Sequence, residues 1–275
     1  MHGNKNSHGR IIVLCAGFLI LVLIVIGCAV NRKAGKETAV TPAVTESMEE
    51  AQLREETETQ TEKQQDTSRE QNFWKLSAGS EVIFGTYEQD NNPGNGPEPL
   101  KWIVLDSQEE RVLLLSRYVI DSKPYNKEYI SSTWEKCDLR DWLNGKFYDE
   151  AFNAEQQEQI MQLEVVNHDN DHNYGDPIPG GNSTYDKLFL LSLEEIEKYT
   201  GTDPEQWEAE PTPYAEEQGV YIWGDPPSCY WWLRSPGGYS GNASCIDTWG
   251  RTDDWGYSVH CTNIGVRPVL WLKLD

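Results

Sequence analysis

Residues 101–120 read KWIVLDSQEERVLLLSRYVI, and this stretch decides the fold class. Two runs of large apolar and β-branched residues, 101–107 and 111–120, flank a short polar turn, which is typical of a β-hairpin. The preceding run EVIFGTY (81–87) has the same character and predicts a further strand. The intervening DNNPGNGPEP (90–99) is rich in Gly, Pro and Asn and predicts a loop.

Three short helices are expected after the hairpin, each at a capping signal. A hydroxyl or amide side chain followed three residues later by Glu or Gln satisfies free backbone N–H groups at a helix start. The expected helices begin at Ser132, Asn153 and Ser192 and end near Leu143, Leu163 and Gly201. Asn144-Gly145 supplies the stop of the first helix, and the apolar strand 187–191 directly precedes the third.

From Pro211 onward the chain reads as loops and strands. The expected strands are 221–224, 230–236, 244–249, 257–262 and 266–274. Strands at both ends with helices between them predict a single α+β domain at 76–275, built on one curled antiparallel sheet with short helices.

The charge balance limits the partners of this domain. The chain has 23 basic and 45 acidic residues, a formal net charge of −22, and residues 76–275 account for 14 basic and 35 acidic residues. A surface this acidic repels phosphate backbones, so nucleic acid is excluded as a partner. Ten of the 11 Trp and all 13 Tyr follow residue 75, which supplies ample material for a core.

The N-terminal region, 1–30, predicts attachment to a membrane. Ile11–Val30 is an uncharged, almost wholly apolar run, long enough to span a bilayer as a helix. Its end, Val25-Ile26-Gly27-Cys28, also resembles a bacterial lipobox, in which the Cys is lipidated after cleavage of a signal peptide. A lipoprotein anchored through Cys28 is favoured over a plain transmembrane span, and both place the rest of the chain outside the cytoplasm.

Residues 31–75 predict a tether. Up to residue 72 the stretch is rich in Glu, Gln and Thr and contains no aromatic residue. Such a segment cannot bury enough apolar surface to offset the entropy of ordering it. The expected arrangement is an anchor, a disordered spacer and a globular head.

Five blocks of the head resemble the successive hallmarks of one uncharacterised bacterial family, a domain of unknown function found mainly in secreted and membrane-tethered proteins. The blocks are TWEKCDLRDWLNGKF (133–147), DKLFLLSLEE (186–195), TPYA (212–215), WWLRSPGG (231–238) and GVRPVLWL (265–272). The ending is also distantly similar to that of formylglycine-generating-enzyme-type domains. That resemblance implies a C-type-lectin-like fold and does not extend to oxidase chemistry, because the WLRS-like segment has Cys229 and no second nearby Cys.

The four cysteines of the head allow disulfides outside the cytoplasm. Cys245 and Cys261 fall in consecutive expected strands and are the favoured pair, while Cys137 and Cys229 are left open. No zinc pattern is present. A weak calcium candidate is the loop with Asp169, Asp171 and Asn173, whose oxygens alternate as in calcium loops; an acidic surface loop without a metal is the favoured interpretation, and no cofactor is required.

Three arginines, Arg140, Arg234 and Arg267, lie in otherwise apolar segments. A buried guanidinium without a partner carries a heavy desolvation cost. Structural ion pairs with acids such as Glu135 and Asp186 are favoured over an anion-binding cluster.

Four tryptophans lie in stretches rich in Gly, Pro or acidic residues rather than in apolar runs, and carboxylates accompany them. The candidate ligand-binding residues are Trp207, Trp223, Trp249, Trp255, Asp247 and Asp253. Aromatic faces with neighbouring acids suit sugar rings, and Trp also anchors protein contacts. The expected function is an extracytoplasmic, membrane-anchored module that binds a carbohydrate or a protein. The alternatives are a glycan hydrolase with a carboxylate pair and a structural or sensory ectodomain without a small ligand.

Overall fold

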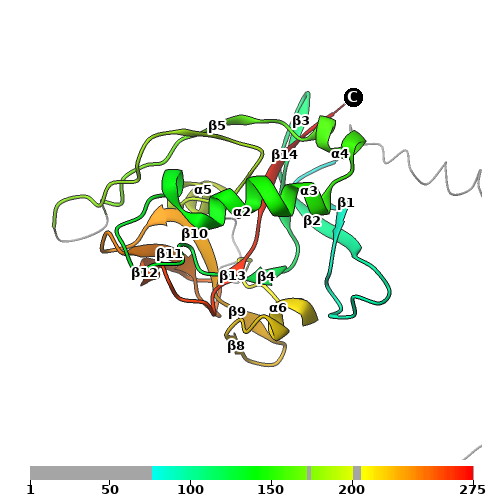
Figure 1. Cartoon of the computed structure of the whole chain (residues 1–275). Helices are drawn as coiled ribbons and strands as arrows, with labels where there is room; N and C mark the ends of the chain where they lie inside the picture. Colours follow the sequence, from blue (N-terminus) through cyan, green and yellow to red (C-terminus); the bar gives the residue numbers. More distant parts are fainter. Residues whose placement is uncertain (1–75, 172–174, 201–205, 275) are drawn as a thin grey trace, which may run out of the picture. The chain divides into compact units, whose positions relative to one another are not determined.

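Two five-stranded sheets form the framework of the protein (Figure 1). The computed structural model describes residues 76–171, 175–200 and 206–274, which lie within one compact unit, Ser68–Asp275. The predicted anchor and Cys28, the tether and Asn173 lie outside the described residues. Among the described residues, no helix is long and apolar enough to cross a membrane.

The first sheet is antiparallel throughout and contains the hairpin that the sequence predicts. In order its strands are β1 (Glu81–Tyr87), β2 (Glu98–Gln108), β3 (Arg111–Ser116), β14 (Val269–Lys273) and β7 (Leu188–Phe189). The C-terminal strand β14 inserts beside β3, with Val269 opposite Leu115. The C-terminal strand therefore lies in the same sheet as the first three strands, between β3 and β7.

The second sheet contains one parallel pair, β10 with β13, and three antiparallel pairs. In order its strands are β12 (Thr252–Ser258), β11 (Asn242–Ile246), β10 (Trp231–Pro236), β13 (Gly265–Val266) and β4 (Asp121–Ser122). Two small hairpins complete the strands. They are β5 (Leu163–Val165) with β6 (Thr184–Asp186), and β8 (Ile222–Trp223) with β9 (Ser228–Cys229).

The α+β class is confirmed, but the expectation of one curled sheet is wrong. The predicted strand 266–274 breaks into β13 and β14, which belong to different sheets. Pro268 lies between them, and proline has no N–H to donate to a ladder. The predicted strand 111–120 is too long, because β3 ends at Ser116, and the chain then crosses to β4 in the other sheet.

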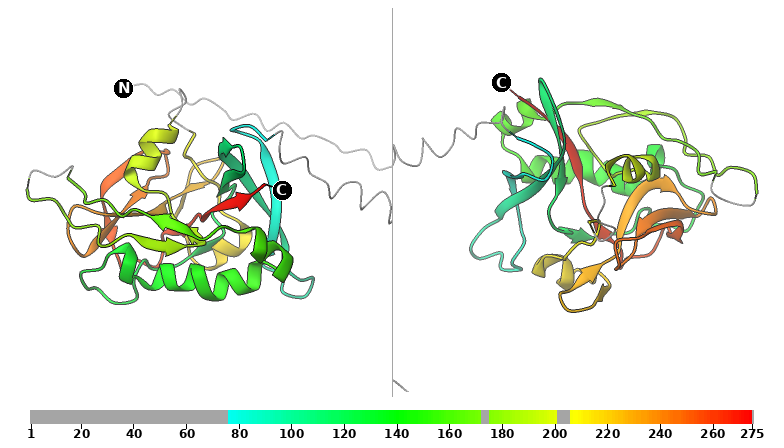
Figure 2. Two further views of the ribbon diagram at one scale, coloured as in Figure 1. Left: turned by 90° about the horizontal axis from the view of Figure 1, so that it is seen from above. Right: turned by 180° about the vertical axis from the view of Figure 1, so that it is seen from behind.

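The helices are short and lie on both sides of the strands (Figure 2). Helix α2 (Asp138–Trp142) continues through a π-helical segment (Leu143–Phe147) into α3 (Tyr148–Ala151). The others are α4 (Ala154–Gln159), α5 (Leu193–Tyr199) and α6 (Pro213–Glu217). In Figure 2 the α2–α3 helix lies on one side of the sheets and α5 on the other.

Two of the three predicted capping boxes are confirmed, at Asn153 and at Ser192. The first is wrong: a 3-10 turn (Trp134–Lys136) occupies that position, and α2 begins after Cys137, whose sulfur accepts the Arg140 N–H at 3.4 Å. The expected stop at Asn144 is also wrong, because the helix continues to Ala151.

The core is built on tryptophans with fully buried rings. Six tryptophans of the described residues lie outside the predicted ligand-binding set, and all are buried or partly buried: Trp102, Trp134, Trp142, Trp231, Trp232 and Trp271. Four of these rings donate their N–H to acceptors in the protein. Large aromatic groups with satisfied polar atoms stabilise a domain that has little regular helix.

Candidate functional site

Three tyrosines line a surface cleft with a volume of about 320 Å³. The lining residues are Tyr221, Tyr230, Tyr257, Asn263 and Ile264, and we call this hollow the tyrosine cleft. The Tyr230 ring lies between the other two, with centroid distances of 5.8 Å to Tyr221 and 5.3 Å to Tyr257. The volume is at the small end of the range for ligand pockets, roughly 300–1,000 Å³.

Backbone hydrogen bonds position two of the three tyrosines. Tyr221 donates its N–H to the Asn263 carbonyl at 2.9 Å, and Gly265 donates to the Tyr230 carbonyl at 2.8 Å. A Cβ on Gly265 would lie 2.9 Å from that carbonyl and 2.3 Å from a Val119 methyl, so only glycine permits this approach. The cleft is therefore preformed by the fold.

A bulge in β12 sets the position of Tyr257. Tyr257 pairs with Ala243, but Asp253 pairs with Cys245, so β12 has extra residues between the two pairs. Gly256 lies there with a φ of 62°, and a Cβ on it would lie 1.9 Å from the Ala243 carbonyl. Bulges commonly redirect a side chain at a functional edge.

The lining of the cleft combines aromatic rings with hydroxyl and amide groups. Burial raises the pKa of Tyr230, and the neighbouring Tyr257 hydroxyl raises it further. The Tyr230 hydroxyl therefore stays protonated at any physiological pH and can both donate and accept a hydrogen bond. Asn263 adds an exposed side-chain amide.

Four of the six predicted site residues come together on the β11–β12 hairpin: Asp247, Trp249, Asp253 and Trp255. Trp255 is 45% exposed, and its ring lies 5.7 Å from that of exposed Tyr239. Trp249 is exposed as well, and the Arg251 guanidinium lies over its ring at 4.7 Å. Both rings present apolar surface to solvent.

The two carboxylates of this hairpin hold the backbone in shape. Asp247 accepts the N–H groups of Trp249 and Arg251, at 2.8 and 2.9 Å, and pairs with the Arg251 guanidinium. Asp253 accepts the Gly256 N–H at 2.9 Å. Their first role is therefore to shape the turn and the bulge, and the predicted contact with ligand hydroxyls stays a prediction.

The remaining two predicted tryptophans differ from each other. Trp223 lies on β8 and is exposed. Trp207 is only 4% exposed, and its ring N–H donates to the Thr200 hydroxyl at 2.9 Å. The assignment of Trp207 as a ligand-binding residue is wrong, because its ring packs against Trp231 in the core.

The three arginines do not form an anion-binding cluster. Arg140 pairs with buried Asp186 at 2.7 Å, as predicted, and Arg234 pairs with Glu195. Glu135 meets Arg140 through its carbonyl only, while its carboxylate accepts from Asn182.

Arg267 has no carboxylate partner among the described residues. Its Nε donates to the Ser116 carbonyl at 2.8 Å, and its guanidinium lies 5.0 Å from the centre of the Trp231 ring. Burial, together with the positive charge of Arg117, lowers its pKa to about 9. The predicted ion pair is therefore wrong for Arg267.

The four cysteines of the described residues are free thiols. Cys245 is buried in β11, and Cys261 lies in a turn after β12 rather than in the expected strand. Burial raises the pKa of Cys245, with smaller contributions from Asp253, Asp247 and Cys261. The structure contains no bond between the two sulfurs, and the disulfide between Cys245 and Cys261 stays a prediction.

The predicted calcium loop uses its first carboxylate internally. Asp169 accepts the Gly180 N–H at 2.9 Å, and Asn170 is buried with its amide donating to the carbonyls of Pro236 and Asp254.

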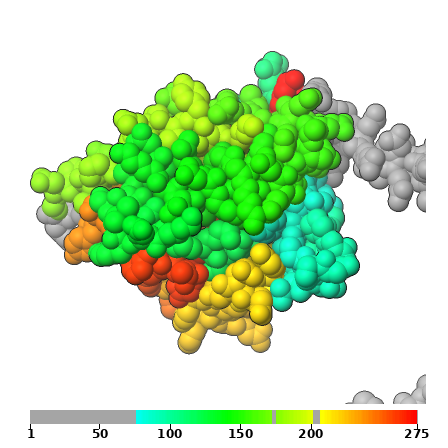
Figure 3. Space-filling model, viewed as in Figure 1, coloured from blue at the N-terminus to red at the C-terminus, as the bar shows by residue number. Residues whose placement is uncertain are grey.

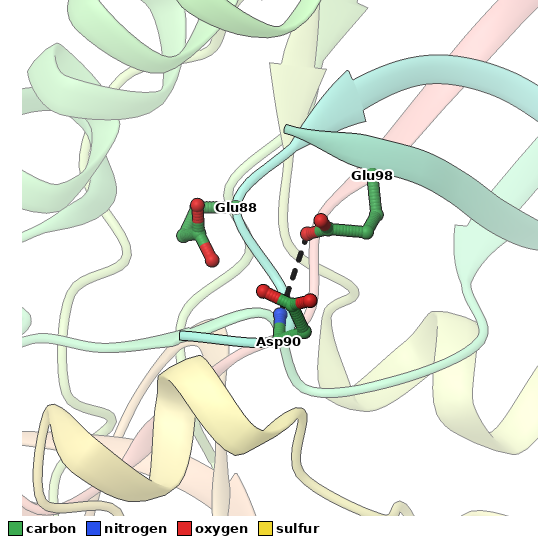
Figure 4. Close-up of side chains that lie close together, drawn as sticks. All are labelled: Glu88, Asp90 and Glu98. Atoms are coloured by element: carbon green, nitrogen blue, oxygen red, sulfur yellow. Dashed lines mark hydrogen bonds between the residues drawn. The ribbon is translucent and has the colours of Figure 1, made fainter. Parts of the chain in front are cut away.

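The structure also contains a cluster of three acidic side chains that the sequence did not predict. Within the described part of the chain, Glu88, Asp90 and Glu98 have carboxylate oxygens within 4.8 Å of one another (Figure 4).

A family model described as a domain of unknown function, DUF6273, matches residues 109–274. The chain belongs to the DUF6273 family. The match covers more than half of the chain and includes every residue that lines the tyrosine cleft, whereas β1 and most of β2 precede it. No curated protein and no solved structure matches the chain significantly.

The tyrosines of the tyrosine cleft were not predicted from the sequence. The predicted site consisted of tryptophans and acids in polar loops, whereas the cleft is lined by tyrosines at the ends of strands. Tyr221 and Tyr230 each precede a strand by one residue, and Tyr257 is the penultimate residue of β12. An aromatic residue at each of three strand ends is the signal that was available in the sequence.

Proposed function

We propose that this protein is a carbohydrate-binding module and that the tyrosine cleft is its binding site. The observation that carries the proposal is a preformed hollow lined by three tyrosine rings that contact one another at tilted and edge-on angles, together with the side chain of Asn263. Sugar rings present C–H faces that pack on aromatic rings, and hydroxyls that bond to neutral polar groups. The five lining residues include no carboxylate, which supports binding rather than hydrolysis.

The exposed rings outside the cleft support an extended site. Trp255 with Tyr239, and Trp249 on the turn before β12, offer further aromatic surface. A chain of several sugars would use such surfaces in addition to one cleft. The same rings also support the alternative of a protein ligand, because exposed Trp and Tyr are common anchors of protein interfaces.

A glycan array probed with the full-length chain tests the proposal. We expect binding without product formation, a loss of at least about tenfold in Tyr257→Ala, which corresponds to ~1.4 kcal/mol of stacking, and a smaller loss in Tyr230→Phe, which removes only a hydroxyl. Tyr185→Ala is the matched control, because Tyr185 is 64% exposed but lies on β6.

The other outcomes of the array decide between the alternatives. Release of product from a bound glycan would support the hydrolase. Binding that Tyr257→Ala and Tyr185→Ala leave equally unchanged would reject the cleft as the site. The absence of binding to every glycan would favour a protein ligand, or a structural or sensory ectodomain.

We propose an extracytoplasmic location with attachment through the N-terminal segment. The supporting features are the apolar run Ile11–Val30 and the lipobox-like sequence before Cys28. Cys28→Ser should abolish metabolic labelling with a fatty acid. Unchanged labelling, or an N-terminus that still includes Met1, would favour the transmembrane span.

The finer fold assignment is also a proposal. The α+β architecture with short helices, and the sequence blocks WLRSP and GVRP at the end of the chain, support a C-type-lectin-like fold. Such folds serve widely in ligand display, although a fold alone does not assign a ligand.

A further inference from the structure

A second hollow lies between the β1–β2 hairpin and the segment that leads into α6, with a volume of about 510 Å³. Its walls are mainly apolar and come from Ile83, Pro99, Tyr118, Pro211 and Pro213. Ile83 is 54% exposed although it is a large apolar residue in the middle of a strand. In Figure 3 the cyan β1–β2 region lies directly beside the yellow segment that contains α6.

Backbone and side-chain bonds hold the two walls together. Tyr214 donates its N–H to the Gln89 carbonyl at 2.9 Å, and the Gln89 amide donates to the carbonyls of Glu98 and Pro99. On the other wall, Pro211 bridges to Val119. The hollow is therefore a preformed groove rather than a gap between loose loops.

The carboxylates of Glu88, Asp90 and Glu98 lie close together (Figure 4). Two of them, Asp90 and Glu98, are also part of the lining of the groove. Glu98 accepts the N–H groups of Gln89 and Asp90, at 2.8 and 3.3 Å, and Glu88 accepts that of Asn92 at 2.8 Å. These bonds keep the three acidic side chains close together, and such a group attracts a positively charged ligand.

The lining as a whole is negative. It contains the carboxylates of Asp90, Glu98 and Glu210 against the single ammonium of Lys101. Lys101 pairs with Ile83 across β1 and β2, and its side chain is exposed. A ligand that fits both features needs apolar groups for the walls and a positive charge for the carboxylates.

We propose that this groove, which we call the acidic groove, binds a peptide segment in which Lys or Arg neighbours apolar residues. A metal ion alone would leave the apolar walls unused, and nucleic acid is repelled by the charge of the head. The groove is lined by a different set of residues from the tyrosine cleft, so the proposal is independent of carbohydrate binding.

Selection from a randomised octapeptide display library on the immobilised full-length chain tests the proposal. We expect selected peptides to be enriched in Lys or Arg flanked by apolar residues. Capture of these peptides should fall at least about tenfold in Glu98→Gln and in Ile83→Asp, since each removes one of the two features. Glu158→Gln, an exposed charge on α4, should capture them as the wild type does.

A gain of binding separates the proposal from a loss of folding. Lys101→Gln removes the positive charge from the lining and should increase capture of the same peptides by about threefold, a modest electrostatic effect. An unfolded variant would not show such a gain.

Three results would overturn the proposal. Selected peptides without basic residues would do so, as would equal capture by the wild type, Glu98→Gln and Ile83→Asp. In sedimentation velocity, self-association of the wild type that Ile83→Asp abolishes would identify the occupant as a second copy of the chain instead. The glycan array, read on the same variants, reports the tyrosine cleft separately.

Discussion

Two groups of tryptophans in this domain have opposite surroundings. Trp102, Trp134, Trp231 and Trp232 are fully buried, and their ring N–H groups donate to Phe84, Asp186, Trp207 and Lys123. Exposed Trp223, Trp249 and Trp255 have no such acceptor within the described part of the chain. A ring whose polar atom is satisfied internally supports the scaffold, whereas a ring with a free N–H and an exposed face is available to a ligand.

The largest expected effect contrasts one member of each group. Trp134→Ala should lower the free energy of unfolding by about 3–5 kcal/mol, because it empties a core site. It also deprives the buried Asp186 carboxylate of one of its three donors, the others being Arg140 and Thr184. Trp255→Ala should change the same quantity by less than about 0.5 kcal/mol.

Urea unfolding of both variants measures this contrast. Far-ultraviolet circular dichroism is the suitable signal, because tryptophan fluorescence changes with the substitution itself. A loss of several kcal/mol in Trp255→Ala would show that the exposed tryptophans also stabilise the fold, and the comparison would then fail.

A smaller effect is expected at Asn144, which joins two elements. Its amide donates to the carbonyls of Arg140 and Leu188 and accepts the N–H groups of Lys187 and Leu188. Asn144→Ala should therefore cost about 1–3 kcal/mol of unfolding free energy, since two backbone N–H groups lose their acceptor. If Asn144 served only as a helix stop, alanine would be neutral or stabilising; Lys146→Ala, on the exposed face, is the control.

Alkaline pH should lower the free energy of unfolding through the buried thiol of Cys137. Burial raises the pKa of this thiol to about 12, above its usual value of about 8.5. The unfolded chain then releases the proton first, so stability is complete below about pH 8.5 and is lost as pH rises, by up to ~1.4 kcal/mol per pH unit.

Unfolding measured from neutral pH to about pH 10 checks this slope. Cys137→Ala should flatten the decline, whereas Cys261→Ala, at a partly exposed thiol, should flatten it less. An identical slope in the wild type and Cys137→Ala would contradict the assignment.

The smallest expected effect concerns thiol reactivity. Cys261 is partly exposed, while Cys137, Cys229 and Cys245 are buried, so N-ethylmaleimide should modify Cys261 first by at least about tenfold in rate. The predicted disulfide gives the opposite result, because Cys245 and Cys261 would then react only after reduction. Peptide mapping of protein taken from its native compartment distinguishes the two states.

The features predicted correctly from the sequence are those set by neighbouring residues. The β2–β3 hairpin and the capping boxes at Asn153 and Ser192 are determined by residues close to one another in the sequence. The first capping box failed because Glu135 bonds to Asn182, a residue far along the chain, instead of to its own helix start.

The site was harder to predict for the same reason. Trp207 resembles a loop residue in the sequence, but in the structure its ring packs against Trp231 and donates a hydrogen bond to Thr200. The tyrosine cleft depends on side chains from 221 to 264 that meet only after the second sheet forms. The tyrosines at the strand ends are visible in the sequence, but no local pattern shows that they lie side by side.

Nuclear magnetic resonance of full-length protein with carbon-13-labelled tyrosine rings tests the central claim most directly. On addition of the glycan selected by the array, we predict shift changes at Tyr221, Tyr230 and Tyr257, and none at exposed Tyr129 or Tyr185. Shift changes at Tyr129 or Tyr185 alone, or no change at any of the three cleft rings at a saturating glycan concentration, would contradict the account.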